Sequence, residues 1–291
     1  MPYQKIISPL PGGAVMAECG PMRLVISGSV GEVPQQETAV RAAQESFEYL
    51  ERIARLRDVL GQRHHDISGE LEDLLARHMV ESVSAVGDRD LTPMAAVAGV
   101  IADAVADFLV DRGMTKVVVD NGGDVAVRLQ PAGEKMERSI TVGIRSEISQ
   151  RAPSHVISLN SGLPSWGVAS SGLGGRSLTR GVASVVTAIA RRAALADAAA
   201  TAIANASFVE DAQVIQVMAD EIDPDTDIPG LPVTVRVGRL SEDKKSEALT
   251  SALNRAETLV RKNVIFGAFV AVQGEYAMTR FFEECLVRSP V

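Results

Sequence analysis

The feature that most constrains the fold of this chain is a pair of β-branched runs joined by a glycine turn. The segment KVVVDNGGDVAVRL carries valines on both sides of Asp120–Asp124. Asn-Gly and Gly-Gly pairs favour positive φ, which a tight connection between two strands requires. The segment therefore predicts a hairpin or a tight strand connection, and any sheet that contains it must accommodate that pairing.

Two long helices are expected before this hairpin. The first covers about 37–60, where apolar residues recur at helical spacing opposite a charged face. The second begins with Thr92 as N-cap and Pro93 at the first helical position, and it ends at Arg112 before Gly113. Small residues dominate its packed face, so this helix can approach a sheet or another helix closely.

Short strands and further helices fill the rest of the chain. Strands are expected at about 23–27, 139–145, 155–159, 166–169, 184–189, 233–237 and 265–272, and helices at about 195–206 and 242–262. Short strands that lie close together in the sequence favour antiparallel pairing. Together with the hairpin, they predict an α+β fold built on mainly antiparallel sheet.

Composition and charge exclude several classes of protein. The chain has 291 residues, 46% of them hydrophobic, which is enough for a sizeable core. Its net charge of -8 argues against a nucleic-acid partner, because neutralising phosphates needs a basic surface. We expect charged residues to interrupt the apolar runs before the roughly 18 residues of a membrane span, and the first residues lack a signal-peptide core. A cytoplasmic protein without membrane partners is therefore expected. The two cysteines, Cys19 and Cys285, indicate neither a disulfide framework nor a zinc cluster.

The alanine-rich segment LADAAATAIANA, residues 195–206, carries an unusual pair of polar side chains. Asp197 and Thr201 are its only polar residues before Asn205. Their i, i+4 spacing puts both on one helix face, where two oxygens could converge on a cation. Alternatively, Asp197 is an N-cap, and Thr201 only hydrogen-bonds back within the helix. The segment alone leaves both interpretations open.

Two glycine-rich segments are candidate ligand loops. In DNGGD the glycines allow a ligand to approach the backbone, although a plain turn has the same composition. In WGVASSGLGGRSLTRG, free amides together with Arg176 and Arg180 could cradle a diphosphate, although a flexible surface loop has the same composition. The acidic segment at 220–227 is expected to be a solvated turn, and the four histidines show no metal-ligand spacing.

The order of these motifs resembles that of the ApbE flavin transferases. NGGD, VASSG, the strand SVVTAIA and ADAAAT follow one another between about 117 and 206. The transferases carry a GGD turn, a VATSG-like loop, an SVTV-like strand and an ADALAT-like helix start in the same order. Within this superfamily the chain is most similar to an uncharacterised ApbE-like group, which shares the helix LTPMAAVAGVIADAV leading into VVVDNGGDV. The resemblance implies one ApbE-like domain over 1–291, or two intertwined subdomains, with two intertwined layers of mainly antiparallel sheet and packed helices.

The resemblance also implies a site. In the transferases, Mg²⁺ bridges the FAD diphosphate and is held by the Asp and Thr of ADALAT and by a main-chain carbonyl near the GGD turn. The matching positions here are Asp197, Thr201 and the backbone of Asp124. Such oxygen donors suit a hard cation. The implied cofactors are Mg²⁺ and either FAD or FMN. The implied ligand cleft comprises Asn121, Gly122, Gly123, Asp124, Ser170, Ser171, Gly172, Arg176 and Arg180.

One departure separates this chain from the transferases. Their HIIDPxTG-like segment, which precedes the SVTV-like strand, has no counterpart in LGGRSLTRG, residues 173–181. Three functions therefore stay open. The first is a Mg²⁺-dependent, transferase-like site for a flavin or nucleotide diphosphate. The second, which the uncharacterised group implies, is a non-flavin enzyme or accessory factor of sulfur or amino-acid metabolism that binds a small anionic ligand at Arg176 and Arg180. The third is a non-catalytic scaffold, packed as a homo-oligomer through the helix at 92–112.

Overall fold

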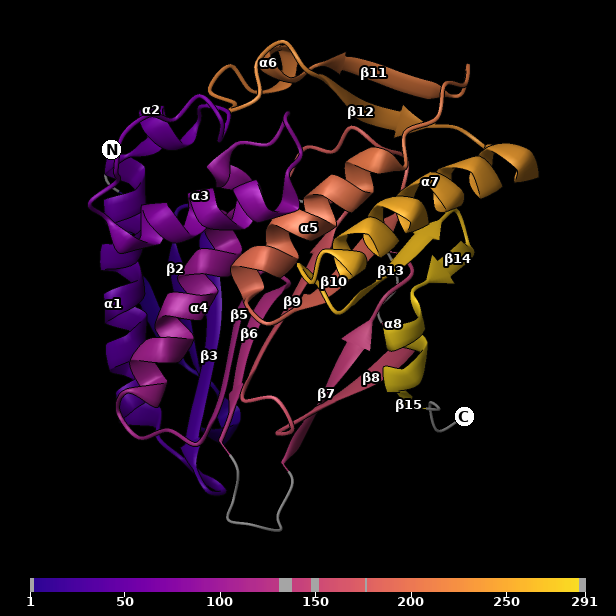
Figure 1. Cartoon of the computed structure of the whole chain (residues 1–291). Helices are drawn as coiled ribbons and strands as arrows, with labels where there is room; N and C mark the ends of the chain where they lie inside the picture. The colour runs from indigo at the N-terminus through magenta and orange to yellow at the C-terminus, as the bar shows by residue number, and fades with distance from the viewer. Residues whose placement is uncertain (1–2, 131–137, 148–151, 176, 288–291) are drawn as a thin grey trace.

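A large antiparallel sheet forms the centre of the structure, a computed structural model that describes residues 3–130, 138–147, 152–175 and 177–287 (Figure 1). The strand order is β1 (Ile6–Pro9), β2 (Val15–Cys19), β3 (Met22–Val30), β5 (Lys116–Asn121), β6 (Asp124–Leu129), β9 (Ser165–Ser171), β10 (Val185–Ala190), β13 (Gly267–Val272) and β14 (Glu275–Met278), with β4 (Val33–Pro34) paired to β3. Each neighbouring pair is antiparallel. The predicted hairpin is confirmed, because β5 and β6 pair with Asn121 opposite Asp124.

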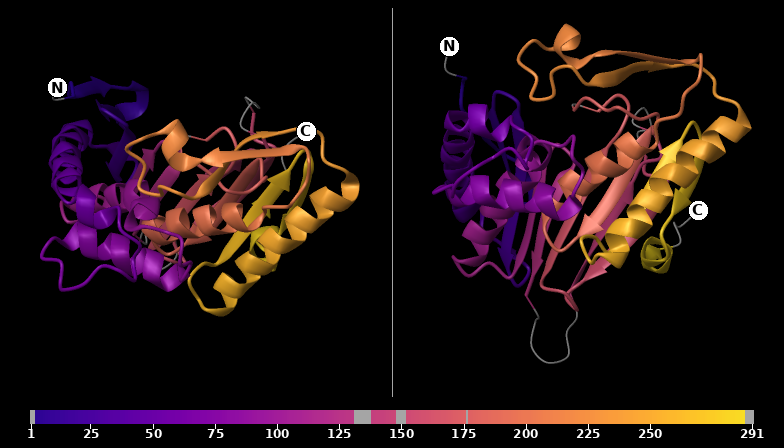
Figure 2. Two further views of the ribbon diagram at one scale, coloured as in Figure 1. Left: turned by 90° about the horizontal axis from the view of Figure 1, so that it is seen from above. Right: turned by 45° about the horizontal axis from the view of Figure 1, so that its top comes forward.

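The long helices cover one face of this sheet (Figures 1 and 2). They are α1 (Gln36–Arg55), α3 (Leu74–Val86), α4 (Val97–Val110), α5 (Ala193–Ala206) and α7 (Glu242–Arg261). Helix α1 packs on β3, α4 on β5 and β6, α5 on β9 and β10, and α7 on β13, while α3 lies against α4 and α5. Most side chains of α5 are buried alanines. Because alanine is small, α5 lies close to both the sheet and α4.

A second, smaller layer covers part of the opposite face. It consists of a three-stranded sheet, β15 (Leu286–Val287), β8 (His155–Asn160) and β7 (Ser139–Ile144), together with α8 (Arg280–Cys285). Its core is richer in aromatic residues and includes Trp166, Phe269 and Phe282. The hairpin of β11 (Val214–Met218) and β12 (Pro232–Val237) extends beyond the C-terminal end of α5, with α6 (Ala219–Ile222) next to it (Figure 2). The mainly antiparallel α+β fold is thus confirmed.

The two predicted N-terminal helices form with altered boundaries. The helix expected at 37–60 ends at Arg55 as α1, and a separate short helix, α2 (Arg57–Leu60), follows it. The helix expected from Thr92 begins as a 3-10 turn, Pro93–Ala96, before α4 starts. Thr92 does occupy the N-cap position before Pro93, but its hydroxyl makes no capping hydrogen bond and instead donates to Asp227, 135 positions along the chain.

Several elements were not anticipated from the sequence. They are β1, β2, β4, α3, β11, α6, β14, α8, β15 and the 3-10 turn Pro11–Gly13. As expected, charged residues interrupt the apolar runs, since Asp103 and Asp107 lie inside Pro93–Val110, although this segment is long and apolar enough to cross a membrane by length and composition alone. More than half of that segment is buried inside the protein. It packs on β5 and β6 and lies beside α1 and α5, as a core helix does.

Candidate metal and ligand site

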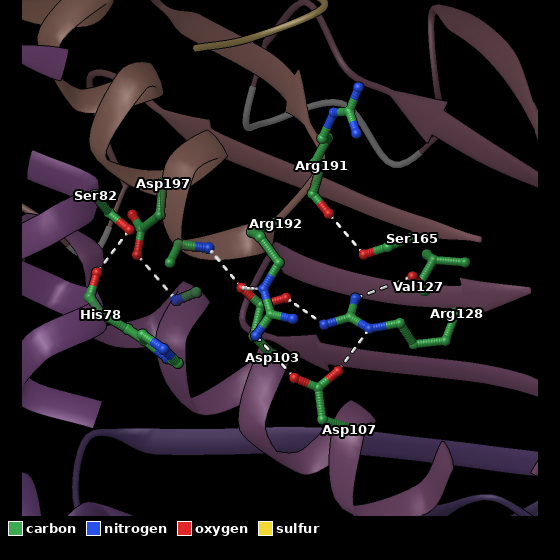
Figure 3. A network of polar contacts seen from close by, with 12 residues as sticks. His78, Ser82, Asp103, Asp107, Val127, Arg128, Ser165, Arg191, Arg192 and Asp197 are labelled. Carbon is green, nitrogen blue, oxygen red and sulfur yellow. Dashed lines mark hydrogen bonds and ion pairs between the residues drawn. The ribbon is translucent and has the colours of Figure 1, made fainter. Parts of the chain in front are cut away.

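Asp197 lies inside α5 rather than at its start. The N-cap position of α5 belongs to Arg192, whose side chain makes no capping hydrogen bond. The interpretation of Asp197 as an N-cap is therefore wrong. Its carboxylate instead accepts a hydrogen bond from the backbone amide of Gly99 in α4, 3.0 Å away (Figure 3). A partner in another helix holds this side chain in a fixed direction.

Asp124, at the start of β6, lies on the face of the sheet that the helices cover, as Asp197 does. Its negative charge acts on Asp197. Desolvation is the main cause that raises the pKa of Asp197 well above its ordinary value, and the negative charge of Asp124 is the second. Hydrogen bonds from the amides of Gly99 and Ala98 oppose this rise. Two carboxylates that disfavour each other's ionisation form a pair that a divalent cation would stabilise. The donor set thus fits a hard metal ion.

Thr201 lies one turn beyond Asp197 on α5. Its hydroxyl donates a hydrogen bond to the backbone oxygen of Asp197, 3.1 Å away. The predicted hydrogen bond of Thr201 back within the helix is therefore confirmed. Both residues are partly exposed. Because the proton of the hydroxyl is committed to the helix, its oxygen keeps lone pairs for a cation or ligand. The two interpretations of Thr201 are therefore compatible.

A hydrogen bond within the turn stabilises the end of the β5–β6 hairpin. Asp120 accepts a hydrogen bond from the amide of Gly123 over 2.7 Å, and both Gly122 and Gly123 adopt positive φ. The Asn121 side-chain amide donates to the carbonyl oxygen of Ala98, 3.1 Å away. Asn121 therefore fixes the turn to the start of α4. This attachment brings the hairpin end and the first turn of α4 to the same place.

The two serines of the VASSG segment point to opposite faces of the sheet. Ser170 lies two residues after Val168 on β9, and Val168 belongs to the aromatic-rich core. Because side chains alternate along a strand, Ser170 faces that layer, where its hydroxyl lies 2.9 Å from the hydroxyl of Thr187. Ser171 faces the helices, and Gly172 follows at a φ of 142°. The structure thus places Ser170 away from Asp197, and only Ser171 on its side.

Arg180, expected to bind an anion, is already engaged. Its guanidinium forms an ion pair of 2.5 Å with Asp90. Its amide donates to the side-chain oxygen of Asn205 on α5, and its carbonyl accepts from Gln216 and Thr234. The second predicted arginine, Arg176, lies outside the described residues. An anionic ligand would therefore have to compete with Asp90 for Arg180.

A cavity of about 320 Å³ lies beside this ion pair. Its lining includes Asp90, Thr92, Arg63 and the segment 227–229. The acidic segment 220–227 is not simply a solvated turn, because Asp227 accepts a hydrogen bond from Thr92 and the Asp225 carbonyl accepts one from Arg57.

The described residues contain no cluster of three or more His, Cys, Asp or Glu side chains that could hold a metal ion by themselves. A cation at Asp124 and Asp197 would therefore need hydroxyl, backbone or ligand oxygens to complete its shell.

A further polar group near this site was missed in the sequence. Asp103 and Asp107 lie on α4 and contact Arg128 and Arg192 (Figure 3). The available signal was the i, i+4 spacing of two carboxylates in an otherwise apolar helix, the same pattern that drew attention to Asp197. No sequence pattern indicated that the backbone amide of Gly99 would bind Asp197.

Comparisons with known proteins agree with this architecture. The family described as AbpE bacteria matches residues 8–278. A UPF0280 protein of Methanopyrus kandleri is 42% identical over 123 residues, which cover 41% of this chain and 44% of the relative. A UPF0280 protein of Methanoregula boonei is 34% identical over 151 residues, 50% of this chain and 58% of the relative. The match thus spans about half the length of these relatives.

Two solved structures share the fold over almost the whole chain. The flavinyl transferase ApbE of Pseudomonas stutzeri, in its apo form, has a TM-score of 0.50 and 13% identity, with 99% of each chain covered. The ApbE protein of Thermotoga maritima has the same TM-score and identity, with 98% of this chain and 100% of that chain covered. At this identity the likeness concerns the fold.

Proposed function

Because the chain belongs to the family described as AbpE bacteria, we propose that it binds Mg²⁺ and, through the ion, the diphosphate of a flavin or another nucleotide, with transferase-like chemistry. The residues that would hold the ion are Asp197, Thr201 and Asp124, the last through its carboxylate or its backbone oxygen. Mg²⁺ prefers oxygen ligands and usually keeps places for water and phosphate oxygens. The fold that the chain shares with the flavinyl transferase of Pseudomonas stutzeri supports the choice of a flavin.

The observation that carries the proposal is the electrostatic opposition of Asp124 and Asp197. Each ionised carboxylate raises the free energy of the other, and burial adds to this at Asp197. A protein gains nothing for its stability from such a pair, whereas a bound cation turns the repulsion into attraction. When bound, the ion would neutralise the developing charge on a diphosphate and orient it for transfer.

The chain's own residues would do the rest. The Gly99 amide fixes the direction of Asp197, and Asn121 fixes the hairpin turn that carries Asp124. Arg180 lies at the far end of the same face of α5, next to Asn205. If Arg180 exchanged Asp90 for a phosphate, the ligand would lie between a cation and a guanidinium.

Titration of the chelator-treated protein with FAD, followed by flavin fluorescence, tests this function. Quenching should require Mg²⁺ and should disappear in Asp197→Asn. The matched control is Asp111→Asn, at an exposed position just after α4, which should behave like the wild type. ADP in place of FAD separates recognition of the diphosphate from recognition of the flavin ring. Absence of Mg²⁺-dependent binding of both FAD and ADP by the wild type would overturn the proposal.

A second candidate is a non-flavin enzyme or accessory factor that binds a small anionic ligand at Arg180. The segment 173–181 favours it, since the histidine-containing segment of the transferases is missing there. In this case phosphate or a small carboxylate would bind without Mg²⁺, and Arg180→Ala rather than Asp197→Asn would abolish binding.

Cytoplasmic location, homo-oligomer formation and the lack of nucleic-acid or membrane partners stay predictions from the sequence.

A further inference from the structure

Two carboxylates of α4, Asp103 and Asp107, form a network of ion pairs with Arg128 and Arg192 (Figure 3). Asp103 lies one turn after Gly99, and Asp107 follows one turn later. Arg128 of β6 contacts both aspartates over 2.8 Å, and Arg192 lies 2.8 Å from Asp107 and 3.4 Å from Asp103. Asp103 and Arg128 are buried. Asp107 and Arg192 are partly exposed, and because the four charges balance, the buried pair is tolerated inside the protein.

Asp103 makes one contact that Asp107 does not share. Its second oxygen accepts a hydrogen bond from the backbone amide of Ala194, 3.0 Å away, in the first turn of α5. First-turn amides lack partners within their own helix, and the N-cap residue Arg192 supplies none through its side chain. Asp103 therefore caps α5 from a neighbouring helix. Its negative charge also lies at the positive end of the α5 dipole.

The same end of α5 is enclosed by two glycines. A Cβ atom on Gly99 would lie 2.6 Å from the amide nitrogen of Ala194, and a Cβ atom on Gly167 of β9 would overlap the backbone of Ala193. Only residues without a side chain allow this approach. The first residues of α5 are thus held by α4, by β9 and by the Asp103 carboxylate. Asp197 follows Ala193 by one helical turn.

We propose that Asp103 is a positioning residue for the cation site. By capping α5 it fixes the rotation and axial position of this helix on α4, and so keeps the Asp197 carboxylate beside Asp124. Asp103 acts through the α5 backbone, because a helix is stiff over one turn. This inference rests on the proposed function, since it concerns the affinity of the ion proposed there.

Magnesium titration of the full chain by calorimetry tests the inference. Replacing residues that orient metal ligands weakens affinity by about 10–100-fold, so Asp103→Ala should weaken Mg²⁺ binding by at least about tenfold. Asp103→Asn should restore most of the affinity, because its side-chain oxygen can still accept from Ala194. The matched control is Asp107→Ala, which removes the contacts to the side chains of the same two arginines but no hydrogen bond from a backbone amide of α5. Its Mg²⁺ affinity should stay close to that of the wild type.

Two outcomes would overturn the inference while leaving the proposed function intact. One is wild-type affinity in Asp103→Ala, and the other is an equal loss in Asp103→Ala and Asp107→Ala, which would indicate general destabilisation. If the wild type binds no Mg²⁺, both proposals fail. Should Asp103→Ala not fold, Asp103→Ser takes its place with Asp107→Ser as control, because serine keeps a polar atom beside the arginines on a shorter side chain.

Discussion

The backbone amide of Gly99 donates a hydrogen bond of 3.0 Å to the carboxylate of Asp197, and so joins two helices whose partner residues lie 98 positions apart. This contact places the polar side chain of an alanine-rich helix at the end of the β5–β6 hairpin. It also makes the first turn of α4 part of the site, although the sequence of that turn contains only apolar residues and glycine.

Gly99→Ala should destabilise the protein and weaken its affinity for Mg²⁺. The added Cβ would lie 2.6 Å from the amide nitrogen of Ala194, so α4 and α5 must separate. Overpacking of this kind costs about 1–3 kcal/mol in the free energy of unfolding. Urea unfolding would measure the loss. Gly61→Ala is the control with a smaller expected effect, because its nearest backbone atom is 3.1 Å away and its φ of -80° suits alanine.

Asp197→Asn should stabilise the metal-free protein near neutral pH. In the folded state the pKa of Asp197 is raised well above the ordinary 3.8 by desolvation and by Asp124. Between these two pKa values the folded state binds more protons than the unfolded state, so stability falls as the pH rises. The asparagine variant lacks this decrease. Unfolding curves from pH 4 upward should therefore diverge, with the variant more stable at the upper end.

At saturating Mg²⁺ the wild type should become more stable than Asp197→Asn. The ion binds and stabilises the wild type, whereas the variant has no carboxylate at position 197 for it to bind. Identical pH profiles for the two proteins would show that Asp197 ionises normally.

Asp73→Ala should lower stability by about 1 kcal/mol at neutral pH, the typical contribution of an N-cap. Asp73 caps α3 through the amides of Leu75 and Ala76 and accepts from Arg52 over 2.8 Å. Burial alone would raise the pKa of Asp73, but the hydrogen bonds from Arg52 and Ala76 outweigh it and lower the pKa.

The contribution of Asp73 should therefore be complete above its ordinary pKa of 3.8 and disappear as the pH falls through the lowered value. Unfolding of wild type and Asp73→Ala across this range gives the difference directly. Asp73→Asn should retain much of the cap but lose the pH dependence, and a difference between wild type and Asp73→Ala that persists at low pH would contradict the assignment.

Asp90→Asn should increase the affinity of the chain for inorganic phosphate or ADP. The variant frees the guanidinium of Arg180 from its ion pair. Because both side chains are partly exposed, the pair is worth no more than about 1 kcal/mol, so the gain should be about twofold to fivefold. Asp66→Asn removes another negative charge from the same cavity without touching this pair and should have a smaller effect. Equal effects would indicate a change of overall charge only.

Local sequence patterns predicted the elements of the fold better than their contacts. The hairpin follows from its glycine turn and valine runs, and α5 from its composition. Thr92 fits the N-cap pattern, yet its side-chain partner is Asp227, which lies 135 positions away in the sequence and is brought close by folding. Alternation along β9 implies that Ser170 and Ser171 face opposite sides, but it does not tell which side carries the helices. Such assignments depend on long-range packing, which a single sequence does not display.

The enclosure of Ala193 between two backbones also limits how this chain can change in length. Each residue added to a helix turns all later side chains by about 100°. One insertion or deletion between Ala193 and Asp197 would rotate the carboxylate away from Gly99 and Asp124, while the start of α5 stayed in place. The number of residues that separate Ala193 from Asp197 is therefore set by the geometry of the site.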